Sequence, residues 1–170
     1  RIDYFYRSSG NIFKPMAAPF VRPADLVETT TIEGNTVPYI LRVETGTINR
    51  AIYQIVMLAD PQDPPPDPWT RSPGWNGRLI YTFGGGCNTG WFRQGAALQE
   101  SPFNDKMLSR GYATVSSTLN TYGNNCNDLL TAEAMMMVKE RFIEAYGPAG
   151  YTMGYGCSGG SYQGHQISDS

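Results

Sequence analysis

Residues 151–160, with the sequence YTMGYGCSGG, constrain the fold of this chain more than any other stretch. They predict a short apolar strand, a turn of small residues and then the start of a helix. Gly156, Ser158 and Gly160 fit the G-x-S-x-G pattern, in which the serine sits on a strained strand-to-helix turn that exposes its hydroxyl. The pattern indicates a nucleophile elbow at Ser158, and an ordinary structural turn is the alternative.

The residue types of this turn suit nucleophilic chemistry. The turn forces the serine into unfavourable backbone angles, and only small neighbours let the strand and helix approach closely. The N-terminus of the following helix offers unpaired N–H groups and a positive dipole end to a developing oxyanion. We therefore expect the N–H of Gly159, directly after the serine, to be one oxyanion donor.

The second half of the chain alternates between strand and helix patterns. Strands are predicted at residues 78–83, 113–117 and 151–155, and Asp128 is expected to cap a helix that ends at Gly147. This order indicates an α/β fold with a mostly parallel sheet flanked by helices.

The first half gives a different pattern. Residues 1–25 mix aromatic residues with prolines, which predicts an irregular segment. Residues 29–32 and 37–44 predict an antiparallel hairpin, and residues 52–58 a buried strand. Residues 60–75 contain six prolines and predict a surface loop.

A glycine-rich run follows the strand predicted at residues 78–83. Gly84, Gly85, Gly86 and Cys87 then lie at the carboxyl end of a strand, as the elbow does, and this edge of a parallel sheet is where ligands bind. A loop of this kind supplies the second oxyanion donor in α/β-hydrolases. We expect N–H groups of Gly85, Gly86 and Cys87 to have this role, and a tight turn without chemistry is the alternative.

The composition excludes several classes of protein. With 41% hydrophobic and 16% charged residues, the 170-residue chain is typical of a globular domain. The formal net charge of −2 provides no basic field for nucleic acid. No apolar run approaches the roughly 20 residues that span a bilayer, and the residue usage favours a secreted protein. No metal or organic cofactor is implied.

The three cysteines are an odd number. In an oxidising compartment they predict one disulfide and one thiol bonded outside this chain, whereas in a reducing compartment all three are small buried residues. Cys87 and Cys126 follow successive predicted strands at one sheet edge, so their pairing is favoured, and pairing of either with Cys157 is the alternative.

The chain lacks credible partners for Ser158. His165 is the only histidine, and it lies about 10 Å along the same predicted helix, too far to act as a base. Asp169 lies on that helix as well. In this fold the acid and histidine follow the serine in sequence. We therefore expect one α/β-hydrolase domain, of which residues 1–77 and 78–170 form the N-terminal portion, with the remainder missing or on a second chain.

The run from Gly156 to Gly160 resembles the nucleophile region of the tannase and feruloyl esterase group of α/β-hydrolases. Residues 30–50 look more like an uncharacterised family of secreted bacterial hydrolase-like proteins. The first resemblance implies that Cys157 forms a disulfide with a cysteine beside the catalytic histidine. That histidine, the acid and the second cysteine have no matching positions here.

These observations predict a secreted serine hydrolase, most simply one that cleaves a carboxylic ester through an acyl-enzyme on Ser158. An amidase or acyltransferase would use the same groups. A non-catalytic binding or structural module that keeps the fold is the alternative from another class.

Overall fold

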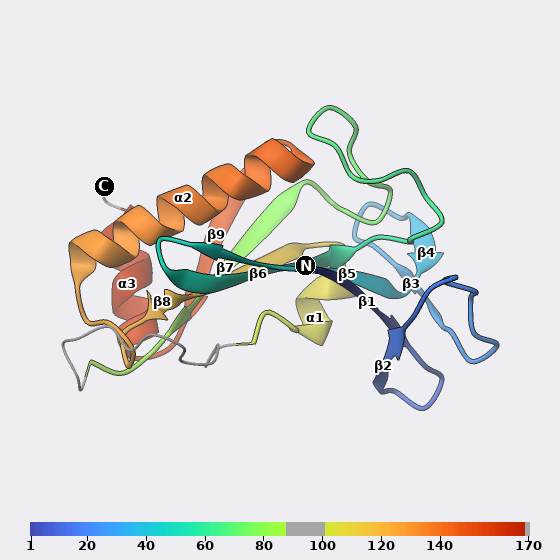
Figure 1. The fold of residues 1–170 in the computed structure, drawn as a ribbon, viewed down its shortest axis with the longest axis horizontal. Coiled ribbons are helices and arrows are strands. Elements are labelled where there is room, and N and C mark those ends of the chain that lie inside the picture. The colour runs from blue at the N-terminus through green and yellow to red at the C-terminus, as the bar shows by residue number, and fades with distance from the viewer. Residues whose placement is uncertain (88–100, 169–170) are drawn as a thin grey trace.

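The computed structural model describes residues 1–87 and 101–168, whose centre is a seven-stranded sheet with the order β2-β1-β5-β6-β8-β7-β9 (Figure 1). Its strands are β1 (Ile2–Arg7), β2 (Phe13–Met16), β5 (Ile40–Ile48), β6 (Ala51–Leu58), β7 (Arg78–Gly84), β8 (Ala113–Thr121) and β9 (Tyr151–Gly156). A separate two-stranded sheet contains β3 (Glu28–Thr30) and β4 (Thr36–Pro38). The helices are α1 (Asp105–Leu108), α2 (Asp128–Tyr146) and α3 (Gly159–Ser168).

The direction of the strands changes along the sheet. β7 pairs in parallel with both β8 and β9, while β2, β1, β5, β6 and β8 pair antiparallel with one another in that order. The mixed sheet is flanked by helices, so the predicted α/β fold class is confirmed. The parallel part is the one that leads into the candidate elbow.

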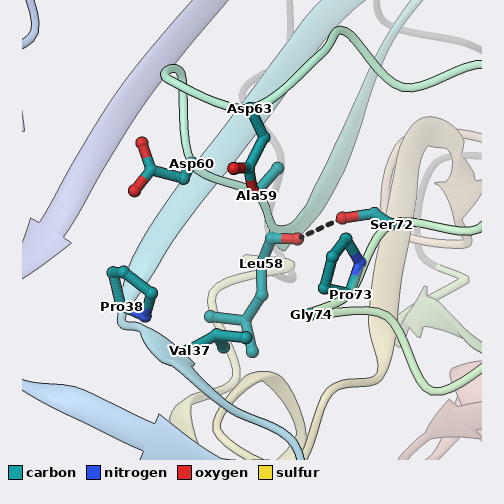
Figure 2. Close-up of a pocket in the computed structure, with 9 residues that line it drawn as sticks. All are labelled: Val37, Pro38, Leu58, Ala59, Asp60, Asp63, Ser72, Pro73 and Gly74. Carbon is teal, nitrogen blue, oxygen red and sulfur yellow. Dashed lines mark hydrogen bonds between the residues drawn. The ribbon is translucent and has the colours of Figure 1, made fainter.

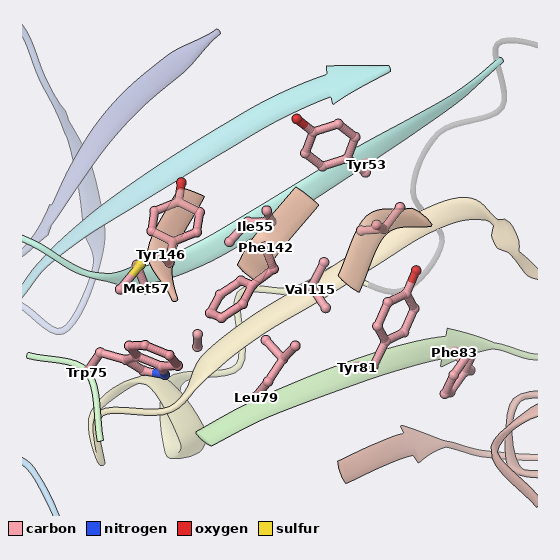
Figure 3. Close-up of a cluster of buried hydrophobic side chains, with 12 residues drawn as sticks. Tyr53, Ile55, Met57, Trp75, Leu79, Tyr81, Phe83, Val115, Phe142 and Tyr146 are labelled. Atoms are coloured by element: carbon pink, nitrogen blue, oxygen red, sulfur yellow. The ribbon is translucent and has the colours of Figure 1, made fainter. Parts of the chain in front are cut away.

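The two longer helices cover one face of the sheet. Helix α2, which lies over the sheet in Figure 1, places Ala134, Val138 and Phe142 at a spacing of four residues, and this buried stripe packs on the strands. Figure 3 shows Phe142 and Tyr146 among the side chains of β6, β8 and β7. Leu108 of α1 belongs to a second apolar cluster, with residues of β5 and β6 that face away from α2.

Helix α2 begins one residue earlier than expected. The cap is Asn127, whose side chain accepts a hydrogen bond from the N–H of Leu130 at 3.0 Å, and Asp128 is the first helical residue. Asparagine and aspartate both cap helices, so the pattern alone did not separate them. The predicted end is confirmed, because Gly147 adopts φ +93° directly after Tyr146.

A buried carboxylate joins β5 to α2. Glu44 accepts hydrogen bonds from Tyr53 at 2.8 Å, from Arg141 at 2.9 Å and from Tyr146 at 2.5 Å, and Arg42 lies 3.4 Å away. Burial alone raises the pKa of Glu44, but the hydrogen bonds from Tyr146, Arg141 and Tyr53 outweigh it and hold that pKa below its ordinary value. We call these residues the Glu44 cluster.

The prediction for residues 1–25 was wrong, because β1 and β2 form an antiparallel pair within them. On its other side β1 pairs with β5, which is distant in the sequence, from Ile2↔Glu44 to Tyr6↔Ile40. Pro15 is tolerated because β2 is at the edge of the sheet, where a missing N–H costs no ladder bond. The predicted hairpin forms only as β3 and β4, and β5 leaves it to join the main sheet.

The proline-rich segment contains no helix or strand between β6 and β7, as predicted, but its end is not at the surface. Trp75 is buried, donates from Nε1 to the Arg78 carbonyl at 2.9 Å and packs edge-on against Phe142. Within the described residues, no helix is long and apolar enough to cross a membrane.

Candidate active site

The turn between β9 and α3 places Ser158 at the carboxyl end of the parallel strands. Ser158 has φ +56°, in the left-handed region that non-glycine residues rarely adopt, and its side chain is exposed. The Cys157 carbonyl accepts from the N–H of Gly160 at 3.0 Å, and the Ser158 carbonyl accepts from Tyr162 at 3.2 Å. Local strain and exposure of the hydroxyl are therefore both present, and they are what an elbow requires.

The two outer glycines of the pattern are needed because α3 lies directly on β7. A Cβ atom at Gly160 would lie 2.3 Å from the Phe83 carbonyl oxygen, and one at Gly156 would lie 2.8 Å from the same atom. The buried Gln163 donates its side-chain N–H to the Gly84 carbonyl at 2.9 Å. Any larger residue at either glycine would push the helix off the strand and move Ser158.

The glycine-rich loop after β7 lies against the elbow. A Cβ atom at Gly85 would be 3.1 Å from the Cys157 carbonyl oxygen and 3.6 Å from the Cβ of Ser158. A Cβ atom at Gly159 would be 2.6 Å from the Gly86 carbonyl oxygen. The structure thus brings together the backbones expected to hold an oxyanion. Their action as donors remains a prediction.

The same loop is fixed on its other side to the segment that follows β8. Cys87 and Cys126 form a disulfide with a Cα–Cα distance of 5.0 Å, the pairing favoured by the sequence. The Gly85 carbonyl accepts from the N–H of Gly123 at 2.8 Å. Cys157 is left as an exposed free thiol next to Ser158.

The described residues provide no base for the serine. Within residues 1–87 and 101–168, no group forms a hydrogen bond with the Ser158 hydroxyl. His165 is exposed and lines a separate cavity of about 260 Å³ beside Ser161, between α3 and β9. Asp169 lies outside the described residues. In the described ranges, no group of three or more aspartate, glutamate, histidine or cysteine side chains could hold a metal ion.

Comparison with known proteins adds one finding. The model of the tannase-like family of unknown function (DUF6351) matches residues 1–170. The chain belongs to this tannase-like family. No curated protein and no solved structure matches it. The family match supports a tannase-like relationship of the chain, and it leaves the activity to be argued from the site.

The tannase-like chain has a cleft beside the elbow that sequence reasoning missed. The cleft has a volume of about 340 Å³ and is lined by Gly86, Gly159, Tyr122, Asp128 and Tyr162, next to the Cys87–Cys126 disulfide. Tyr122 and Asp128 lie in the loop after β8 and at the start of α2. No local pattern marks them, because only the sheet topology brings them to the elbow.

A hydrogen-bond network holds one wall of this cleft. The Tyr122 hydroxyl donates to the Asp128 carboxylate and lies 3.0 Å from the Gln166 Oε1 on α3. Hydrogen bonds from Gln166 and Tyr122 lower the pKa of Asp128, while burial and the bond to Asp128 raise the pKa of Tyr122. At neutral pH the pair is therefore an ionised carboxylate and a neutral phenol.

A pocket at the other end of the molecule is too small for a substrate. It lies between β4 and the proline-rich segment, and Figure 2 shows the Ser72 hydroxyl bonded to the Leu58 carbonyl across it. Its volume of about 30 Å³ has room for little more than a water molecule. The elbow, with its strained serine, is therefore a better candidate site than this small pocket.

Proposed function

We propose that this protein is a serine hydrolase of carboxylic esters with Ser158 as its nucleophile. The observation that carries the proposal is the conformation of Ser158, which is held at φ +56° with an exposed hydroxyl. A strained residue persists only where the surroundings impose it, and such strain gathers at functional sites. The tannase-like family membership favours ester chemistry over the amidase or acyltransferase alternatives.

In the proposed reaction, the Ser158 oxygen attacks the ester carbonyl carbon and its proton passes to a histidine. N–H groups of Gly159 and of the loop from Gly85 to Cys87 stabilise the negative charge on the carbonyl oxygen. The carbon–oxygen bond to the alcohol then breaks, and the alcohol leaves with the proton. Water repeats the sequence on the acyl-enzyme and releases the acid.

We further propose that the histidine and its acid come from polypeptide outside residues 1–170, in the same domain or on a second chain. A secreted location, proposed from composition, agrees with the Cys87–Cys126 disulfide. Cys157 would then bond a cysteine near that histidine and hold it beside the elbow. A non-reducing peptide map of the natural protein should contain Cys157 in a mixed disulfide, and a reduced Cys157 in oxidised material would remove this bridge.

The test of the function uses Ser158→Ala in the complete natural protein with short-chain p-nitrophenyl esters. Hydrolysis should fall to the background rate while the unfolding temperature is retained. Ser161→Ala is the matched control, because Ser161 is exposed on the same helix but lies outside the turn. Hydrolysis that survives Ser158→Ala would contradict the proposed mechanism.

The non-catalytic alternative is favoured by one observation, the absence of a base for Ser158 among the described residues. A hydroxyl without a base is a weak nucleophile. If the complete protein hydrolyses no ester of the tested series and reacts with no serine-directed reagent, the binding module is the better description.

A further inference from the structure

A buried glutamine connects the helix that follows the candidate nucleophile to the glycine-rich loop. Gln163 lies on α3, and it is fully buried. Its Nε2–H donates a hydrogen bond to the Gly84 carbonyl oxygen at 2.9 Å, although the two residues are 79 positions apart in the sequence. The bond therefore ties α3, which begins directly after Ser158, to the end of β7.

This hydrogen bond holds one particular peptide group. A peptide group is planar and trans, so its C=O and its N–H point in opposite directions. The Gly84 carbonyl shares a peptide group with the Gly85 N–H, which is one of the proposed oxyanion donors. The Gly84 oxygen also accepts from the Tyr122 N–H at 3.1 Å. Both bonds keep the carbonyl on the side of Gln163 and Tyr122, and they therefore keep the Gly85 N–H on the opposite side.

The loop needs such a restraint because glycines flank this peptide group on both sides. A glycine passes between backbone conformations at little steric cost, so the peptide between Gly84 and Gly85 is free to rotate unless its carbonyl is held. The next peptide is held in a similar way, since the Gly85 carbonyl accepts from the Gly123 N–H at 2.8 Å. Oxyanion donors are most effective when they are fixed before the reaction begins.

The oxygen of the same glutamine amide is not used. Within the described residues, the buried Gln163 Oε1 has no hydrogen-bond partner. An unpaired buried oxygen lowers stability, and an apolar side chain of similar size would avoid this cost. Stability alone therefore does not explain a glutamine at this position, whereas its hydrogen bond to Gly84 does.

We propose that Gln163 is a positioning residue of the hydrolase, which fixes the Gly84–Gly85 peptide so that the Gly85 N–H faces the oxyanion. The inference rests on the proposed function, because the oxyanion forms on a carbonyl that Ser158 attacks. Gln163 is fully buried and acts only through the loop. Its place on α3 makes one helix support both the nucleophile and an oxyanion donor.

The first test is Gln163→Met in the complete natural protein, because methionine has a similar volume and lacks the amide. The kcat of ester hydrolysis should fall about tenfold, less than the about 10²–10³-fold for complete loss of a donor, since the Tyr122 N–H still holds the carbonyl. KM should be unchanged, and the unfolding temperature should not fall. A glutamine with a purely structural role would give the reverse, a loss of stability with kcat retained.

The matched control is Gln54→Met. Gln54 is a half-buried glutamine on β6 whose amide donates to the Thr45 hydroxyl at 3.1 Å. This variant should change neither kcat nor KM, because the bond that it removes joins β6 to β5 and not the loop to α3.

A second variant tests whether a donor at this position is what matters. In Gln163→Glu, a protonated carboxyl group can donate to the Gly84 carbonyl, whereas the ionised form only accepts and repels it. Burial raises the pKa of this carboxyl group. The kcat of the variant, relative to the wild type at the same pH, should therefore be highest in acid and fall about tenfold as pH rises through that pKa. The same ratio for Gln163→Met should not depend on pH.

A measurement without substrate separates this inference from the proposed function. NMR relaxation dispersion at the Gly85 amide reports rotation of the peptide on the microsecond to millisecond timescale. Gln163→Met should introduce exchange that the wild type and Gln54→Met lack. If the wild type hydrolyses no ester and this exchange still appears, the proposed function fails while the hold of Gln163 on the loop stands. Absence of the exchange, or an unchanged kcat in an active enzyme, overturns the inference.

Discussion

The Glu44 cluster and the Ser158 elbow are polar groups placed on the same sheet, but their surroundings are opposite. Glu44 is buried, and tyrosine and arginine donors from β6 and α2 satisfy its carboxylate. Ser158 is exposed, its backbone is strained, and its hydroxyl has no partner among the described residues. Buried polar groups are normally satisfied and relaxed when their role is structural. Strain and unused hydrogen-bonding capacity are therefore what set the elbow apart.

The strongest test of this contrast is to disturb the close packing of α3 on β7 that supports the elbow. Gly160→Ala should destabilise the protein by about 4 kcal/mol and abolish activity, because its Cβ would lie 2.3 Å from the Phe83 carbonyl oxygen. Gly164→Ala on the same helix is the control, since a Cβ there meets nothing within 4 Å and alanine favours helix. Urea unfolding measures both. Equal stability of the two variants would show that the close contact does not hold the turn.

Removing the Cys87–Cys126 disulfide tests whether this bond, which lies beside the candidate site, also stabilises the fold. Replacing Cys87 and Cys126 together by serine should lower stability by about 3 kcal/mol, since a 39-residue separation is no longer closed in the unfolded chain. Thermal unfolding with and without reductant measures the effect. An unchanged unfolding temperature would mean that this bond contributes only to the local shape of the loop.

The prediction for the Glu44 cluster concerns stability alone. Glu44→Gln should cost about 2 kcal/mol, because Tyr53, Arg141, Tyr146 and Arg42 lose a charged acceptor, while hydrolysis is retained. The folded pKa of Glu44 is below its ordinary value of 4.5, so this contribution is complete above pH 4.5 and disappears as pH falls through the folded pKa. The wild type and variant should therefore converge in stability in acid. A difference that persists there would place its origin in packing.

Relieving the strain at the elbow should have the smallest effect, and of the opposite sign. Ser158→Gly should stabilise the protein by about 1 kcal/mol, because glycine adopts φ +56° without a steric penalty. The same variant should have no esterase activity. A destabilised Ser158→Gly protein would show that the serine side chain contributes to the fold.

Local sequence patterns predicted the part of the fold that local interactions determine. The elbow depends on glycines next to Ser158, and the stripe of α2 recurs at helical spacing, so both are visible in the sequence. β1 was missed because its pairing with β5 spans about forty residues and its aromatic residues do not alternate with polar ones. β2 was missed because it contains Pro15. A proline is acceptable in a strand at the edge of a sheet, and only the folded structure places β2 there.

The candidate site likewise contains some residues that the sequence predicted and others that it did not. The loop at Gly85 and the Cys87–Cys126 pair were predictable because both follow strands that end at one edge of the sheet. The place of Tyr122 and Asp128 beside the elbow was not predictable, because a tyrosine after a strand and an aspartate at the start of a helix carry no pattern that assigns them to the site. Their role depends on the register of β7 beside β8, which only the folded structure provides.

Covalent labelling of the complete natural protein tests the nucleophile most directly. A fluorophosphonate reagent should add to a single site, and mass spectrometry of the peptides should place the adduct on Ser158. Labelling should disappear in Ser158→Ala and persist in Ser161→Ala. An adduct on another residue, or an active esterase that leaves Ser158 unlabelled, would contradict the account.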